Sequence, residues 1–140
     1  MDTSFLNNIN WLAVFVAALA YFFLGAIWYS KLLFANRWIA LLKIDVNAPD
    51  AKKGVAPIMI GSLICMFLIS TGLAILVDRM DLVGWQSGLK LGALTGVGFS
   101  AMSISINYLY EKKPVSLFLI NAGYAIFGQI IAAIILCSWQ

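Results

Sequence analysis

Four long apolar segments alternate with short polar ones along the chain. The apolar segments cover about residues 11–34, 55–77, 88–110 and 115–139. A helix that spans a membrane needs about 20 mostly apolar residues, because the hydrocarbon core is about 30 Å thick. Each segment is long enough, and short connections make sequential helices antiparallel neighbours. The pattern therefore predicts an all-α membrane protein, a single domain in which four transmembrane helices form an antiparallel bundle.

Composition points to the bilayer as the solvent. Hydrophobic residues make up 63% of the 140 residues and charged residues 11%, and the mean hydropathy is +0.96. An average soluble domain is about 45–50% apolar and about 25% charged. The basic residues do not alternate with aromatic residues on a polar face, so we expect the lipid bilayer as a partner and no nucleic acid.

Basic residues are distributed unevenly between the two sides of the predicted bundle. The first and third connections, with their flanks, hold Lys31, Arg37, Lys43, Lys52, Lys53, Lys112 and Lys113. The opposite side holds Arg79 and Lys90. Because basic loops stay in the cytoplasm, we expect these two connections to be cytoplasmic and both termini to lie outside a cytoplasmic (inner) membrane.

The third segment carries a ridge of small residues that would let another helix approach closely. Gly88, Gly92, Gly96 and Ser100 recur every four residues, and Ser103 and Asn107 continue the same helical face. In the first segment, Gly25 is a further candidate packing position. The partner helix of the ridge is either in the same chain or in a second copy, and a groove open to a ligand is the alternative.

Aromatic and carboxamide side chains within the spans form the candidate site. A buried amide without a hydrogen-bond partner costs several kcal/mol in lipid, so each amide needs a partner. Asn107 and Asn121 lie near the same end of adjacent segments, where they could meet. Either polar contacts between helices or a binding pocket fits this pattern. The candidates are Tyr21, Trp28, Tyr29, Asn107, Tyr108, Asn121, Tyr124 and Gln129.

The stretch GAIWYSKLLFANRW, residues 25–38, ends the first segment. Trp11 and Trp28 are separated by about 26 Å along a helix, so they are expected at opposite membrane interfaces. Neighbouring side chains on a helix point about 100° apart. We therefore expect Tyr29, on the face of Gly25 and Tyr21, to point inward while Trp28 faces lipid. Residues 32–35 and 38–42 are predicted to lie along the interface, with Arg37 and Lys43 facing water.

Several kinds of chemistry lack their usual residues. The chain has no His, and no Asp or Glu lies in mid-span, which disfavours proton-coupled transport and any metal or haem cofactor. Cys65 and Cys137 should differ by about 15 Å in membrane depth, which predicts free thiols. An enzyme is also disfavoured. Four-helix membrane glutathione transferases bind an anionic thiol with arginines, and here Arg37 and Arg79 fall on opposite predicted faces.

The first and last segments resemble a bacterial membrane protein family catalogued as domain of unknown function 1761. GAIWYS and LINAGY are the most specific stretches, and Lys31 departs from the proline expected after the serine. The resemblance implies a small four-helix integral membrane protein and no activity or catalytic residue. The shared residues are Asn10, Trp11, Gly25, Trp28, Tyr29, Phe34, Trp38, Asn107, Glu111, Pro114, Asn121, Gly123, Tyr124 and Trp139.

Two functions fit these patterns. The small-residue ridge favours a structural or interaction module that self-associates as a homo-oligomer. The alternative is a binder or transporter of a small, largely apolar molecule or lipid, held in an intramembrane pocket lined by the aromatic and amide candidates.

Overall fold

The computed structural model describes residues 4–140, which form helices joined by turns. The helices are η1 (Ser4–Asn7), α1 (Trp11–Trp28), α2 (Ala35–Leu42), α3 (Val55–Arg79), α4 (Trp85–Thr95), the π-helix η2 (Gly96–Ala101), α5 (Met102–Tyr110) and α6 (Val115–Ser138). Because α4, η2 and α5 are continuous, this part of the chain has four helices long and apolar enough to cross a membrane. The all-helical fold with four transmembrane segments is therefore confirmed.

The first spanning helix ends earlier than its apolar pattern predicts, at Trp28 instead of Phe34. Tyr29 leaves helical geometry, and the Ser30 hydroxyl donates a hydrogen bond to the Ile27 carbonyl at 2.6 Å. A serine side chain that bonds to nearby backbone competes with the helix ladder. The remaining 18 residues still extend about 27 Å, close to the hydrocarbon thickness.

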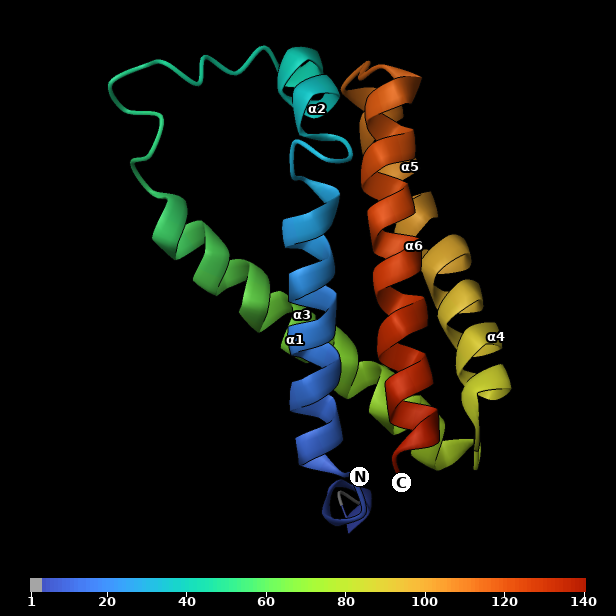
Figure 1. The fold of residues 1–140 in the computed structure, drawn as a ribbon. Coiled ribbons are helices and arrows are strands. Elements are labelled where there is room, and N and C mark those ends of the chain that lie inside the picture. The colour runs from blue at the N-terminus through green and yellow to red at the C-terminus, as the bar shows by residue number, and fades with distance from the viewer. Residues whose placement is uncertain (1–3) are drawn as a thin grey trace.

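Helix α6 lies at the centre of the bundle, in contact with α1, α3 and α4 (Figure 1). Small residues dominate its buried positions and allow neighbouring backbones to come close. These positions are Ala122, Ala125, Gly128, Ala132 and Ala133. A hydrophobic core forms where α1 begins and α6 ends, from Ile9, Ala13, Val14, Ala17, Leu73, Ala74, Val77, Leu91, Ala132, Ala133, Leu136 and Cys137.

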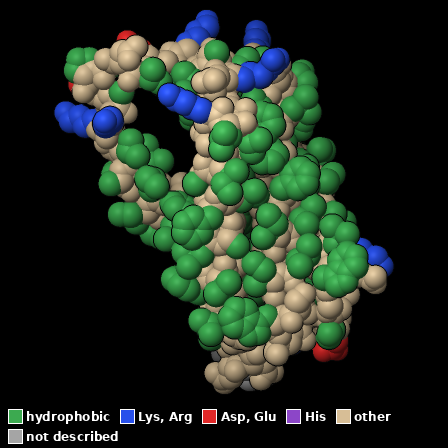
Figure 2. Space-filling view, viewed as in Figure 1, with side chains coloured by type: hydrophobic (Ala, Val, Ile, Leu, Met, Phe, Trp, Pro, Cys, Tyr) green, Lys and Arg blue, Asp and Glu red, His purple; other side chains and the backbone are tan. Residues whose placement is uncertain are grey.

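The two ends of the bundle differ in charge. Helix α2 and the turn between α5 and α6 lie at the end opposite to that core (Figure 1). Most Lys and Arg side chains visible in Figure 2 gather at this end, which we call the basic end. The first and third connections therefore share one end of the molecule.

Helix α3 stands away from the bundle over its first turns and packs on it from about Met66 onward, where the Met66 sulfur accepts a hydrogen bond from the Tyr124 hydroxyl at 3.8 Å. Ser70, Leu73, Ala74 and Val77 are buried there, whereas every residue of 55–60 is exposed. Figure 1 shows the first half of α3 diverging from α1 toward the basic end. Along this helix Cys65 is exposed, and Cys137 of α6 is buried. Both thiols are free, as predicted.

Candidate functional site

Aromatic rings fill the notches that glycines leave between α1 and α6. The three pairs are Tyr124 on Gly25, Trp28 on Gly123 and Tyr21 on Gly128. A Cβ added at Gly25 would lie 2.8 Å from the Tyr124 hydroxyl oxygen, and one at Gly123 would lie 3.0 Å from the Trp28 ring. At Gly128, the Tyr21 ring occupies the place of the Cβ. The Tyr21 ring therefore requires Gly128, the Tyr124 and Trp28 rings pack closely on their glycines, and Gly25 is a packing position.

A chain of hydrogen bonds crosses the interior near the basic end. The Tyr29 hydroxyl donates to Asn121 Oδ1 at 2.7 Å, and Asn121 Nδ2 donates to the Tyr108 hydroxyl at 2.6 Å. The turn after α1, the central helix α6 and the third span are thereby linked by one amide. Tyr29 thus points inward, as its spacing from Gly25 predicts.

Contacts between aromatic rings continue this series of hydrogen-bonded side chains along α1. Tyr21 meets Tyr124 edge-on, Tyr124 meets Tyr29, and Tyr29 meets Trp38 of α2, each pair with ring centroids 5.3 Å apart. Edge-to-face geometry at this distance is favourable for aromatic pairs. We call Tyr21, Tyr29, Tyr108, Asn121 and Tyr124 the tyrosine cluster. Its hydroxyls and one amide supply hydrogen bonds and packing, and none of its members is a carboxylate or imidazole.

Trp28 also faces the bundle, contrary to the expectation that it faces lipid. Its indole nitrogen donates to the Ile120 carbonyl at 3.0 Å, and its ring lies 5.6 Å from that of Phe127 on α6. Both side chains reach α6, Trp28 at Ile120 and Tyr29 at Asn121, so the 100° between neighbouring helical positions turns neither of them to lipid. Trp11, at the other end of α1, is 45% exposed.

The glycine ridge of the third span packs against α6 of the same chain. A Cβ added at Gly88 would lie 2.5 Å from Ile134 Cα, and one at Gly96 would lie 2.8 Å from Ile126 Cα. Gly92 meets Ile130 in the same way. Residue numbers rise on one helix as they fall on the other, so α4 and α6 are antiparallel. Ser100 continues the contact, since it accepts a hydrogen bond from the buried Gln129.

Beyond Ser100 the predicted face is wrong. Ser103 and Asn107 are exposed, whereas Ala101 is buried and Ser105 and Tyr108 are half-buried. The π-helix η2 explains the change, because its wider turn adds about one residue and rotates the following helix. Tyr108 therefore takes the place beside Asn121 that the spacing assigned to Asn107.

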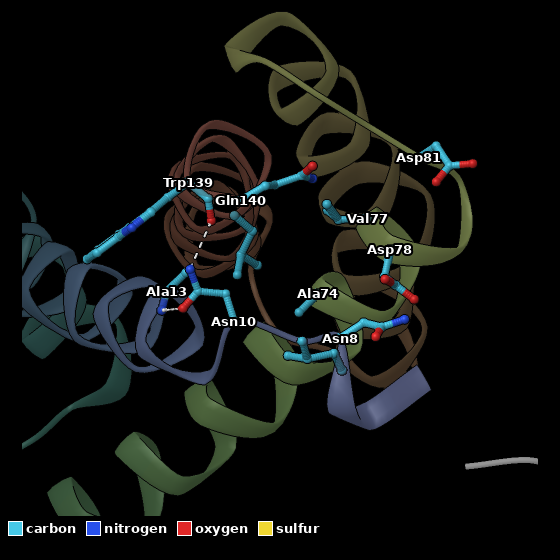
Figure 3. Close-up of a pocket in the computed structure, with 11 residues that line it drawn as sticks. Asn8, Asn10, Ala13, Ala74, Val77, Asp78, Asp81, Trp139 and Gln140 are labelled. Carbon is cyan, nitrogen blue, oxygen red and sulfur yellow. Dashed lines mark hydrogen bonds between the residues drawn. The ribbon is translucent and has the colours of Figure 1, made fainter. Parts of the chain in front are cut away.

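A separate pocket of about 160 Å³ lies at the end where α1 begins and α6 ends (Figure 3). Asn10 caps α1 through the Ala13 amide and donates to the Trp139 carbonyl at 3.4 Å, which closes one side. Asp78 and Asp81 lie on the other side, on α3 and the turn after it. None of the candidate site residues lines this pocket.

Four spanning helices around a packed interior define a small multi-pass membrane protein. Residues 12–137 match the family described as Protein of unknown function (DUF1761), and the chain belongs to that family. The resemblance inferred from GAIWYS and LINAGY is thereby confirmed. No curated protein and no solved structure matches the chain.

Proposed function

We propose that this protein is a structural or interaction module that self-associates in the membrane through α3. The proposal rests on the exposure of side chains at the start of α3. Ile58, Met59 and Ile60 are 67%, 48% and 61% exposed. Since every residue of 55–60 is exposed and consecutive helical residues point about 100° apart, the first six residues of this helix have no partner on any side within the described chain.

The outward face of α3 has the composition of a helix–helix contact. Gly61, Cys65 and Gly72 share one face at spacings of four and seven residues, together with the exposed Leu68. A Cβ added at Gly61 or Gly72 would meet nothing within 4 Å. Small residues on an open face favour close helix association in lipid. By contrast, the ridge at Gly92 is occupied by α6.

The candidate site residues favour a structural role over a ligand pocket. The notches at Gly25, Gly123 and Gly128 are filled by rings of the same chain, and both sides of the Asn121 amide have partners. The tyrosine cluster thus has the features of polar and aromatic contacts that hold helices together. We also propose that the basic end faces the cytoplasm of an inner membrane, from the positive-inside rule.

Cys65 allows a direct test of self-association. Oxidation of membranes that contain the wild-type chain should give a disulfide-linked dimer that Cys65→Ser abolishes, since Cys137 is buried. Gly61→Leu should reduce the dimer and lower the mass measured by light scattering in mild detergent. Leucine at this position has open space within the chain, so the monomer should still fold.

Gly98→Leu is the matched control, because a Cβ at Gly98 also meets nothing within 4 Å and this glycine lies on the third span. The proposal requires Gly98→Leu to leave the dimer fraction unchanged. A wild-type chain that is monomeric in both assays would refute self-association. Equal loss from Gly61→Leu and Gly98→Leu would refute the interface.

A further inference from the structure

A groove opens on the surface at the basic end, between α5 and α6. Its volume is about 210 Å³. It is lined by Ser105, Tyr108, Leu109, Lys112, Lys113, Val115 and Phe118. These residues belong to the last turns of one span, the first turn of the next and the loop between them. The groove therefore lies where the ends of two spans meet the headgroup region of a bilayer.

The groove has a basic part and an apolar part. Lys112 and Lys113 supply two ammonium groups, and Val115 begins α6, whose N-terminal amides add positive potential. Glu111 lies 4.0 Å from Lys113 and offsets part of this charge. Leucine, valine and phenylalanine side chains form the rest of the lining, with the hydroxyls of Ser105 and Tyr108.

Lys112 has a backbone conformation that usually belongs to glycine. Its φ is 53°, and its amide bonds to the Leu109 carbonyl while the Lys113 amide bonds to that of Tyr108. These two bonds form the Schellman motif that ends α5, in which glycine is the usual residue at the left-handed position. A lysine here adds charge at the groove at a conformational cost of about 1–2 kcal/mol.

We propose that this groove binds an anionic phospholipid. The headgroup phosphate pairs with Lys112 and Lys113, and an acyl chain lies along Leu109, Val115 and Phe118. Charge complementarity selects this occupant, because basic pockets between spans bind anionic headgroups. An apolar wall next to the charges suits a lipid better than a soluble anion.

Native mass spectrometry tests the proposal. The purified protein is titrated with phosphatidylglycerol or with phosphatidylcholine that has the same acyl chains. The wild type should bind phosphatidylglycerol more tightly. Lys112→Gly should weaken that binding about fivefold, since one basic residue contributes about that factor at a membrane surface. Glycine suits the backbone at this position, so the variant should fold.

Lys43→Gly provides a matched control. Lys43 also has a left-handed backbone, with φ 54°, at the end of a helix, and it also lies at the basic end. This variant removes the same charge from a residue that is not part of the groove lining, so phosphatidylglycerol binding should be unchanged. Equal weakening by the two variants would overturn the proposal, as would equal binding of both lipids. Competition by free glycerol phosphate at the same concentration would assign the site to a soluble anion and also overturn it.

Discussion

At the scale of single residues, Asn121 joins three separate parts of the chain with one side chain. Interhelical hydrogen bonds in membranes average about 0.6 kcal/mol and reach about 1.7 kcal/mol. Asn121→Leu removes two such bonds and leaves the hydroxyls of Tyr29 and Tyr108 without this partner. We expect a loss of about 1–3 kcal/mol in the free energy of unfolding, measured by denaturant titration in mixed micelles.

The chain offers an internal control for that measurement. Asn107→Leu makes the same replacement at an exposed amide whose side chain forms no hydrogen bond within residues 4–140. It should not destabilise the protein, because it removes no hydrogen bond and leucine suits a lipid-facing position at least as well as an unpaired amide. Similar losses from both variants would mean that the Asn121 bonds contribute nothing specific.

Sequence spacing predicts much of the tyrosine cluster and fails at one identifiable point. Tyr21, Gly25 and Tyr29 share a helical face, so their inward position can be read from the sequence. Tyr108 lies beside Asn121 whereas its neighbour Asn107 is exposed, because a π-helix changes the helical phase between Gly96 and Ala101. Nothing in the apolar pattern marks that wider turn. The pairing of rings with glycines on another helix likewise depends on tertiary contact.

At the scale of whole helices, the third span shows how a glycine's environment decides its importance. Gly92 is in contact with the α6 backbone, whereas Gly98, on the same long helix, has open space around it. Gly92→Ala forces the two helices apart and should cost about 1–3 kcal/mol, the usual penalty for overpacking. Gly98→Ala should be neutral or stabilising. Thermal unfolding of each variant in detergent measures the difference, and equal melting temperatures would contradict this packing.

Hydropathy predicts the presence of the four spans better than their ends or their packing. Ranges 55–77 and 115–139 nearly match α3 and α6. The apolar pattern does not predict the early end of α1, because residues 32–34 are as apolar as the span itself. It does not predict the divergence of α3 from the bundle either, for a related reason. When the surrounding solvent is lipid, an exposed helix face is as apolar as a buried one.

At the scale of the whole molecule, the fold brings the charges of two distant loops together. Helix α2 and the turn after α5 lie at one end of the bundle, far from the start of α1 (Figure 1). Seven of the nine basic residues belong to these two connections and their flanks. The charge asymmetry from which the orientation is predicted is therefore present in the folded molecule as well as in the sequence.

This asymmetry predicts the orientation in the membrane. In a Cys65→Ser background, a cysteine at Lys52 should react with an impermeant thiol reagent only after the cells are permeabilised, because positive loops remain in the cytoplasm. A cysteine at Asn8, which is exposed at the opposite end, should react in intact cells. The two positions serve as controls for each other, since each must become reactive once both sides are accessible. Labelling at Lys52 and protection at Asn8 in intact cells would reverse the orientation and move the phospholipid groove to the outer leaflet.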